Sequence, residues 1–354
     1  MKIEKTELAG KINMVKSIVP KKTPYEAIQG VLVEGNYLIA NNMETAAKVK
    51  IEATTDTPFI IPSKAFDLIN SLPNGEVEIK PGKDSIIIEV GNIKNKFAAH
   101  SEDLFQRPNI EKTDAAQSFE ISSESFLRSV KRVAFAVADN SANGTMNALC
   151  LRAKEGKLNY IGLDGHMIAW DKMDYDGEFE LLIPKNTIDK LLSIGLNGEL
   201  RIEHSDTGAL FITEECEVST RLVNGEYFDV KKMMMDGTLH TSVSRPRMLE
   251  ALNRARMCCM GEKSPVKMNF TENDVSITTA VATANYDEEI PLLKNMESPL
   301  TIGFDSKLLI DCLRAFDNEE VSLDFTSAKA PLLIHAEDTE FLTLLLPVKL
   351  RGAA

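Results

Sequence analysis

The stretch LLIPKNTIDKLLSIGLNGELRIE, at residues 181–203, decides the fold of this chain. It predicts a short apolar strand, a helix whose first turn contains Pro184, a turn at Asn197-Gly198 and a second strand. The predicted helix is amphipathic because its apolar residues fall on one face at helical spacing: Ile188, Leu191 and Leu192.

The same pattern occurs twice more, as FIIPSKAFDLINSLPNGEVEIK at 59–80 and LTIGFDSKLLIDCLRAFDNEEVSLD at 300–324. The three copies are spaced by close to one third of the 354-residue chain. We therefore predict one unit repeated three times, with domains at 1–117, 118–237 and 238–354. The polar linkers 112–118 and 235–240 mark the boundaries.

Each predicted repeat opens with another helix that carries one narrow apolar stripe at i, i+4, i+7 and i+11. The stripes are Leu8, Ile12, Val15 and Val19; Phe126, Val130, Val133 and Val137; and Met248, Leu252, Ala255 and Cys259. Each stripe predicts a helix with one buried face.

Short alternating runs follow the helices and predict hairpins across Glu34-Gly35-Asn36, Glu155-Gly156 and Glu272-Asn273-Asp274. The last predicted strand is Glu340–Leu350. Each repeat should thus hold two helices and roughly eight short strands. The predicted fold class is α+β, with two helices packed on antiparallel sheets in each of three domains.

Composition narrows the function. The net charge is −13 and the pI about 5.0, which argues against nucleic-acid binding over the whole surface. The five cysteines contain no CxxC pair, which favours reduced thiols. The N-terminus lacks the apolar region of a signal peptide, and no run is long enough for a membrane helix. We expect a cytoplasmic protein without membrane contact.

Basic residues gather on the opening helices. Those of the second and third helices lie on faces turned away from the apolar stripes, whereas Lys11 and Lys16 flank the stripe of the first. A solvated helix face is the simplest interpretation of one such helix, but three equivalent outer faces that are basic or small and polar indicate a surface for DNA phosphates. No recognition-helix motif accompanies them, so the contact should be independent of sequence. The candidate DNA-facing residues are Lys11, Lys16, Arg128, Lys131, Arg132, Arg247 and Arg254.

Catalytic and metal-binding patterns are absent from the sequence: the histidines lack ligand spacing, and no nucleophile, P-loop or zinc-protease motif occurs. We predict no catalytic residue, no metal and no cofactor. Asp164-Gly165-His166 interrupts an apolar run and is best interpreted as a turn that shapes a groove. An enzyme with a site at a domain junction, using Asp164 and His166, is one alternative; a protein-binding scaffold is another.

Several motifs resemble the bacterial DNA polymerase III beta subunit, the replicative sliding clamp. They are LDGHMIAW at 163–170, LLIPKNTIDKLL at 181–192, NGEYFDVKKMM at 224–234 and LLLPVKL at 344–350. With the three repeats, this resemblance covers the whole chain.

The resemblance implies a function without catalysis. Two three-domain chains would close head to tail into a homodimeric ring, with helices lining the hole and sheets outside. Double-stranded DNA would pass through without sequence preference, and the ring would make the polymerase processive. The implied partners are the replicative polymerase alpha subunit, the clamp loader, repair polymerases and ligase, all bound through short linear motifs.

The resemblance also implies a hydrophobic peptide pocket between the second and third domains. Matching positions are Met146, Leu163, Gly165, His166, Met167, Ile168, Phe228, Lys232, Met233, Leu345, Leu346, Pro347, Val348, Lys349 and Leu350. The family usually has Arg at the positions of Met167, Lys232 and Lys349, and Pro at that of Phe228. These differences predict a more apolar pocket.

The ring seam implied by the resemblance lies between the first and third domains. Its candidate residues are Lys94, Lys96 and Phe97 on one side and Met257 and Cys258 on the other. The strand around residues 297–302 is expected beside the latter pair.

Overall fold

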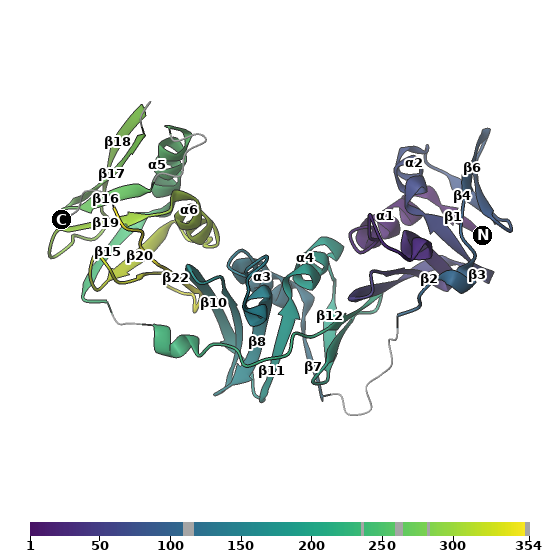
Figure 1. Cartoon of the computed structure of the whole chain (residues 1–354), viewed down its shortest axis with the longest axis horizontal. Helices are drawn as coiled ribbons and strands as arrows, with labels where there is room; N and C mark the ends of the chain where they lie inside the picture. Colours follow the sequence, from purple (N-terminus) through teal and green to yellow (C-terminus); the bar gives the residue numbers. More distant parts are fainter. Residues whose placement is uncertain (109–116, 235–236, 259–264, 282–283, 351–354) are drawn as a thin grey trace. The chain divides into compact units, whose positions relative to one another are not determined.

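The computed structural model describes residues 1–108, 117–234, 237–258, 265–281 and 284–350. They divide into two compact units. Figure 1 shows the helices and strands coloured along the sequence. Unit 1 comprises Met1–Arg128 and Asn186–Asn224, and unit 2 comprises Ser129–Lys185 and Gly225–Ala354.

Unit 1 contains two antiparallel sheets, with strand orders β1-β4-β5-β6 and β2-β3-β14-β13-β12-β7. The strands of the first are β1 Lys2–Glu4, β4 Glu76–Pro81, β5 Ser85–Val90 and β6 Ile93–Ala98. Those of the second are β2 Gly30–Asn41, β3 Thr45–Pro62, β7 Gln117–Ser122, β12 Glu199–His204, β13 Gly208–Ile212 and β14 Cys216–Arg221. Helices α1 (Lys5–Val15) and α2 (Phe66–Ser71) contact each other, and α1 also packs on β2 and β3. Short 3-10 turns lie at η1 Glu26–Ile28, η2 Ser63–Ala65 and η3 Glu102–Leu104.

Unit 2 also contains two antiparallel sheets, with orders β11-β8-β9-β10-β22-β21-β20-β15 and β18-β17-β16-β19. The first comprises β8 Ala148–Lys154, β9 Lys157–Leu163, β10 Met167–Asp174, β11 Phe179–Pro184, β15 Leu239–Ser244, β20 Glu320–Phe325, β21 Leu332–His335 and β22 Leu342–Leu345. The second comprises β16 Val266–Phe270, β17 Asp274–Val281, β18 Ala284–Pro291 and β19 Leu300–Phe304. Helices α5 (Arg245–Cys258) and α6 (Ser306–Arg314) lie side by side. The 3-10 turns are η4 Gly144–Asn147 and η5 Val230–Met233.

The predicted helices are confirmed. Besides those above, α3 spans Ser123–Ala134 and α4 spans Lys185–Ile194. Pro184 ends β11 directly before α4 instead of lying inside its first turn. The described stripe residues are all buried, although Val19 and Val137 lie beyond the ends of their helices. Cys259 lies outside the described residues.

One predicted hairpin is wrong. The chain does not reverse at Glu34-Gly35-Asn36: β2 continues through them as one strand beside the 18-residue β3. Gly35 has a φ of 59°, and the pairing shifts register on both sides of it, so it forms a bulge in place of a turn. Long strands therefore replace pairs of short ones, and residues 1–108, the described part of the first repeat before β7, hold six strands, β1–β6, instead of roughly eight.

The last strand is also shorter than predicted. It ends at Leu345, and the residues from Leu346 to Leu350 are irregular. Pro347 has no backbone N–H to donate to a sheet, which explains why the ladder stops before it.

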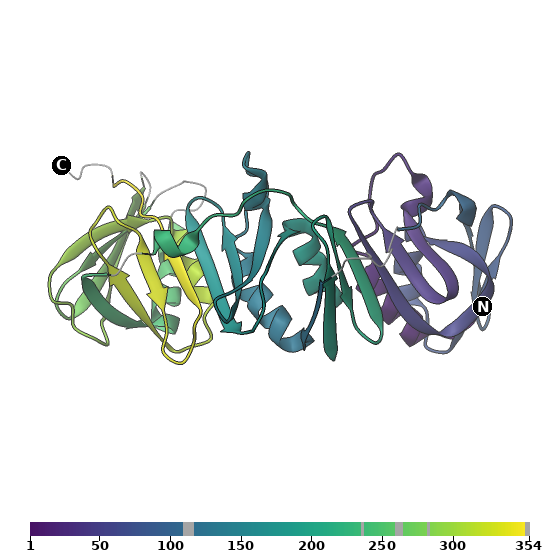
Figure 2. The same ribbon diagram turned by 90° about the horizontal axis from the view of Figure 1, so that it is seen from below.

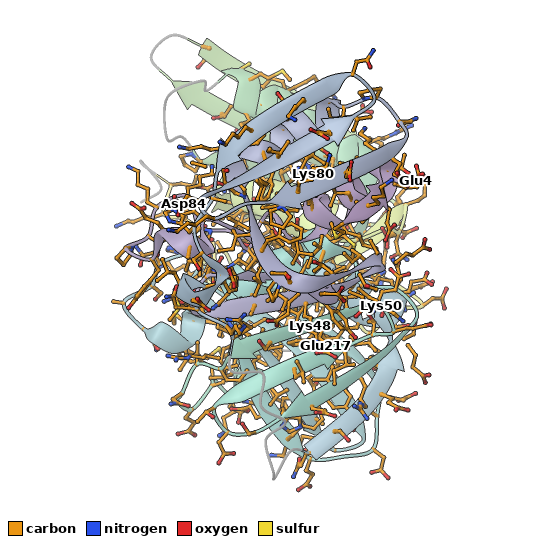
Figure 3. All side chains as sticks on the ribbon, turned by 90° about the vertical axis from the view of Figure 1, so that its right-hand side faces the viewer. Glu4, Lys48, Lys50, Lys80, Asp84 and Glu217 are labelled. Carbon is orange, nitrogen blue, oxygen red and sulfur yellow. The ribbon has the colours of Figure 1, made fainter. Side chains whose placement is uncertain are left out.

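Both larger sheets join strands from neighbouring predicted repeats. In unit 1, β3 pairs with β14, as between Val49 and Cys216. Figure 3 shows Lys48 and Glu217 on this pair, with Nζ and Oε2 3.9 Å apart. In unit 2, β22 pairs with β10, so the yellow C-terminal strands in Figure 2 continue the teal sheet. This pairing explains why the compact units differ from the repeats. The domain boundaries stay a prediction, and parts of both linkers, 112–116 and 235–236, lie outside the described residues.

A buried chain of hydroxyl groups fastens α4 onto the sheet of unit 1. Thr187 Oγ1 lies 2.9 Å from Thr45 Oγ1 on β3 and 2.7 Å from Thr220 Oγ1 on β14. These bonds satisfy polar groups that burial would otherwise leave without partners. Within the described part of the chain, no helix has the length and apolar character needed to span a bilayer.

Candidate partner-binding and nucleic-acid surfaces

A tight turn forms the centre of the predicted partner surface. The Asp164 carboxylate accepts hydrogen bonds from the backbone N–H groups of His166 and Met167, at 2.8 and 2.9 Å. Gly165 has a φ of 89°, which favours glycine at this position. The turn leaves His166 exposed and places Met167 at the start of β10. Asp164, a candidate catalytic group in the enzyme alternative, thus has a structural role in the backbone turn.

The C-terminal segment lies against this turn. Met167 pairs with Leu345 in the β10–β22 ladder, and the Leu346 N–H donates to the His166 carbonyl oxygen at 2.9 Å. Further on, the Val348 N–H donates to the Gly303 carbonyl oxygen on β19 at 2.8 Å. A Cβ atom on Gly303 would lie 2.5 Å from Leu350 Cδ2 and 3.1 Å from the Val348 carbonyl oxygen, so the tail packs closely against this glycine.

The segment 225–233 approaches the same region of unit 2. A Cβ atom on Gly225 would lie 2.7 Å from Thr145 Cγ2, beside Met146 in η4. The buried Tyr227 donates its hydroxyl to the Ile161 carbonyl oxygen on β9 at 3.4 Å and packs edge-on against Phe228. Burial raises the pKa of this phenol above its usual value.

Exposure divides the predicted pocket residues into three groups. Leu163, Met167, Ile168 and Leu345 are buried; Met146, Phe228, Pro347, Val348 and Leu350 are half-buried; Gly165, His166, Lys232, Met233, Leu346 and Lys349 are exposed. The ladder and the turn bring together residues 163–168 and 345–346. The Lys232 ammonium lies 3.0 Å from the Asp229 carboxylate on its own segment. Tyr227 and Gly303 also support this surface but were not predicted from the sequence, because only their three-dimensional neighbours reveal them.

A cavity of about 750 Å³ lies beside the same segment. Its walls include Arg152, Lys172, Trp170, Tyr227 and Lys231, and none of the predicted pocket residues lines it. The Lys172 ammonium sits 3.9 Å from the centre of the Trp170 ring, and burial lowers its pKa.

Three of the candidate DNA-facing residues are exposed without an ion pair among the described residues: Arg128, Lys131 and Arg247. Two others are engaged locally. The Lys11 ammonium lies 2.7 Å from the Glu215 carboxylate, and Lys16 donates to the Asn13 side chain at 2.8 Å.

Arg132 differs from its expected outward orientation. Its side chain is only 19% exposed, and its guanidinium lies 3.0 Å from the Asp317 carboxylate and 5.6 Å from the centre of the Phe341 ring. The helical angle turns it away from the apolar stripe, yet Asp317 in the turn between α6 and β20 covers it. A helical wheel includes no tertiary neighbours, so the sequence could not reveal this cover.

Arg254 is exposed but its charge is compensated. Its guanidinium makes two hydrogen bonds to the Glu288 carboxylate on β18, at 2.9 and 2.7 Å. The Tyr286 hydroxyl donates to the same carboxylate. These bonds raise the pKa of Arg254 and leave less of its charge for phosphate.

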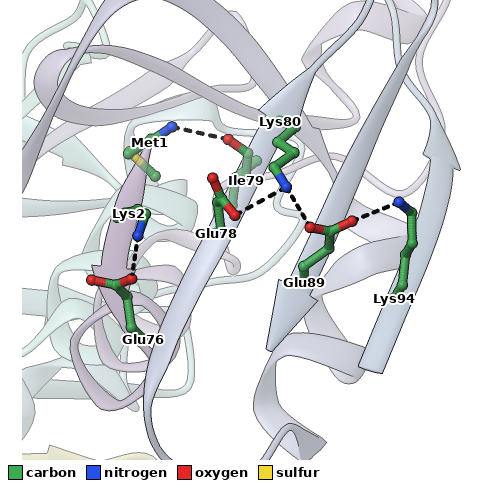
Figure 4. A network of polar contacts seen from close by, with 8 residues as sticks. All are labelled: Met1, Lys2, Glu76, Glu78, Ile79, Lys80, Glu89 and Lys94. Carbon is green, nitrogen blue, oxygen red and sulfur yellow. Dashed lines mark hydrogen bonds and ion pairs between the residues drawn. The ribbon is translucent and has the colours of Figure 1, made fainter. Parts of the chain in front are cut away.

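The predicted seam residues lie on the edge strand of the smaller sheet in unit 1 and at the end of a helix in unit 2. Lys94, Lys96 and Phe97 belong to β6, the edge strand of its sheet in unit 1. Figure 4 shows the adjoining charge ladder: Lys80 bridges Glu78 and Glu89, and the other Glu89 oxygen lies 2.7 Å from the Lys94 ammonium. Lys96 is exposed and makes no ion pair with the described residues.

In unit 2, Met257 is 68% exposed and Cys258 half-buried at the end of α5. The strand expected near residues 297–302 corresponds to β19, which the tail contacts through Val348 and Gly303. The opposite edge of that sheet is β18, which was not among the predicted seam elements.

Comparisons with known proteins agree with this architecture. Residues 120–229 match the central domain of the DNA polymerase III beta subunit, and residues 235–349 match its C-terminal domain. The chain belongs to the DNA polymerase III beta-subunit family. A beta sliding clamp of Pseudomonas aeruginosa is 22% identical over 96% of each chain.

Solved structures share the fold over nearly the full length. The beta subunit of Thermotoga maritima superposes with a TM-score of 0.90 at 21% identity, covering 99% of both chains. The sliding clamp of Bacillus subtilis gives 0.89 at 20% identity, covering 99% of this chain and 98% of its own. As a family member, the chain is a beta sliding clamp, a non-catalytic subunit of a DNA polymerase that acts in DNA replication.

Proposed function

We propose that two copies of this chain join head to tail into a closed ring that encircles duplex DNA and keeps the replicative polymerase on its template. A ring holds DNA by topology, so it needs only weak contacts with the phosphates. This explains how a chain with a net charge of −13 can remain bound to DNA.

Complementary edge strands are the observation that carries the proposal. On β6, Lys94 and Lys96 lie on one exposed face, and on β18 the exposed face presents Asp287 and Glu289. Edge strands offer unpaired N–H and C=O groups to another chain. Opposite charges on facing strands favour that pairing and oppose pairing of like edges. Because β6 and β18 are different surfaces, their contact is heterologous, and two such contacts close a ring of two copies.

The exposed basic residues of the opening helices supply the DNA contacts. Arg128, Lys131 and Arg247 have guanidinium and ammonium groups available for phosphates, with no base-reading element beside them. Such contacts are independent of sequence and break easily, as sliding requires.

Partner proteins bind through short peptides on the surface formed by residues 163–168, 228–233 and 345–350. It combines apolar side chains with a few polar groups, which suits a short extended peptide. Met167 and Phe228 make it more apolar than the usual family pocket, so it should prefer motifs with large aliphatic or aromatic side chains. The partners are the polymerase alpha subunit, the clamp loader, repair polymerases and ligase.

Retention on DNA of two topologies tests the ring. The protein is loaded onto nicked circular DNA with its clamp loader and ATP, and dissociation is followed before and after the circle is linearised. A ring stays on the circle and slides off the ends of the linear form.

Equal dissociation from both forms would contradict encirclement. If a partner peptide still bound in that case, the protein would be a recruitment scaffold that does not hold DNA.

A further inference from the structure

We infer that Arg132 is a positioning residue: it fixes β22 against β10 and thereby aligns the partner-binding surface at the far end of the same strand pair. The expected effect on peptide binding rests on the proposed function, whereas the effect on the pairing of β22 with β10 can be tested separately.

The strand pair concerned is short. β10 and β22 pair over only four residues, from Met167 opposite Leu345 to Trp170 opposite Leu342. A ladder of four pairs is weak by itself, and a one-residue slip would turn each side chain of β22 to the opposite face. The partner surface needs a definite register, because its floor includes Met167 and Leu345.

Arg132 holds the end of the ladder that lies away from the partner surface. Its guanidinium lies over the ring of Phe341, the residue directly before β22. It also lies 3.9 Å from the carboxylate of Asp171, which follows Trp170, the last residue of β10 that pairs with β22. It therefore contacts both strands just beyond their last pair. Asp171 is 4% exposed, so this cationic neighbour compensates a charge that burial makes costly.

The same guanidinium reaches a third element. Asp317, in the turn after α6, accepts a hydrogen bond from Arg132 at 3.0 Å. Its neighbour Phe316 packs on Phe341 with ring centres 4.6 Å apart, and both rings are buried. Arg132 on α3 thus joins β10, the start of β22 and the α6–β20 turn at one point.

The two ends of the ladder are close. From Asp171 to Met167 is four residues, or about 13 Å of strand. At the near end, the Leu346 N–H bonds to the His166 carbonyl oxygen. If Phe341 loses its contact with Arg132, β22 should become more mobile. The strand is short enough for that added mobility to extend from Phe341 to Leu346 at its other end.

Two readouts test the inference, hydrogen–deuterium exchange of residues 341–346 and binding of a fluorescent peptide from the polymerase alpha subunit. Arg132→Ala should exchange faster there and bind the peptide about tenfold more weakly, within the range seen for coupled networks. Arg132→Lys keeps the charge but loses the planar guanidinium and its contact with the Phe341 ring. Its exchange rate and its peptide affinity should therefore lie between those of the wild-type protein and Arg132→Ala. Glu124→Gln, at an exposed position of the same helix that has no proposed binding role, is the control and should change neither readout.

Unchanged exchange at 341–346 in Arg132→Ala would overturn the inference. If that variant fails to fold, Asp317→Ala decides, because Asp317 is 83% exposed and truncation removes the carboxylate that accepts the 3.0 Å hydrogen bond. Exchange of residues 341–346 in Asp317→Ala should then be faster, and exchange at the wild-type rate would overturn the inference. If even the wild-type protein binds no peptide, the proposed partner surface fails, while the exchange result still decides the role of Arg132.

Salt dependence separates this role from DNA contact. Weak duplex binding should keep its salt dependence in Arg132→Ala, because the enclosed guanidinium touches no phosphate. A reduced slope equal to that of Arg128→Ala, with normal exchange, would assign Arg132 to DNA instead.

Discussion

The backbone N–H of Leu346 donates to the carbonyl oxygen of His166 at 2.9 Å, one residue beyond the Met167–Leu345 pair of the β10–β22 ladder. This bond joins a turn formed by Asp164 to a tail that has already left the sheet. It holds two segments of the proposed partner surface, which are far apart in the sequence, against each other.

Leu346→Pro should weaken partner binding by removing this donor. The loss of one backbone hydrogen bond costs about 1 kcal/mol, and the freed tail should lower peptide affinity by about tenfold. Fluorescence anisotropy with a polymerase-derived peptide measures the effect. Leu346→Met keeps the amide and an apolar side chain and is the control. Equal affinity of both variants would show that the bond does not support binding.

Charge reversal at the edge strands should break the ring and a second reversal should restore it. Lys96→Glu or Glu289→Lys alone places like charges on the proposed seam and should shift the protein toward monomers in analytical ultracentrifugation. The double variant regains opposite charges and should recover the dimer. Lys80→Glu, on β4 of the same sheet, controls for general charge change. A double variant with no more dimer than either single variant would argue against this pairing of β6 with β18.

Neutralising the exposed helix cations should weaken DNA binding without altering sequence preference. Each of Arg128→Ala, Lys131→Ala and Arg247→Ala should reduce the slope of log K against log salt by about 0.9 for each phosphate that the protein no longer neutralises. Binding of a short duplex at low salt gives the slope. Arg254→Ala should change it less, because Glu288 already compensates that guanidinium. An equal effect of all four would show that the Glu288 pair opens on DNA.

Gly162→Ala should destabilise unit 2. A Cβ atom there would lie 2.5 Å from the Val133 carbonyl oxygen of α3, so the helix would have to move off β9. Overpacking of this kind costs about 1–3 kcal/mol in denaturant unfolding. Gly10→Ala in α1 is the matched control, since a Cβ atom there meets nothing within 4 Å. Because alanine favours the helix over glycine, this variant should raise the free energy of unfolding by about 0.5–1 kcal/mol. A neutral Gly162→Ala would mean that α3 can shift without cost.

Lys190→Met should stabilise the protein at neutral pH. Lys190 is 5% exposed on α4, its Nζ has no hydrogen-bond partner among the described residues, and burial lowers its pKa although the charges of Glu44 and Asp189 oppose this. The folded state therefore binds the proton less tightly than the unfolded chain, whose lysine pKa is about 10.4. Stability of the wild-type protein should rise as pH increases toward that value.

The gain in the variant should thus be about 1–3 kcal/mol at pH 7 and smaller near pH 10, as measured by urea unfolding at both. A gain that stays constant with pH would reflect packing of the methionine and not removal of a buried charge.

The sequence alone determined the positions of the helices and of two of the three named hairpins, because apolar spacing and turn residues are local signals. The stripes of Leu8, Phe126 and Met248 predicted three helices, and Glu155-Gly156 predicted a hairpin that has positive φ at both residues. Local signals misled at Gly35, where the long partner strand β3 turned an expected reversal into a bulge.

Only the tertiary structure decided which charged residues remain available. Arg128 and Arg132 lie one helical turn apart and look alike in sequence, yet Asp171, Asp317 and Phe341 enclose the second. Likewise, β18 becomes an edge only through the order of strands in its sheet. Helical and strand periodicity depends on neighbours a few residues away, whereas cover, edges and ion pairs depend on segments that are distant in the chain.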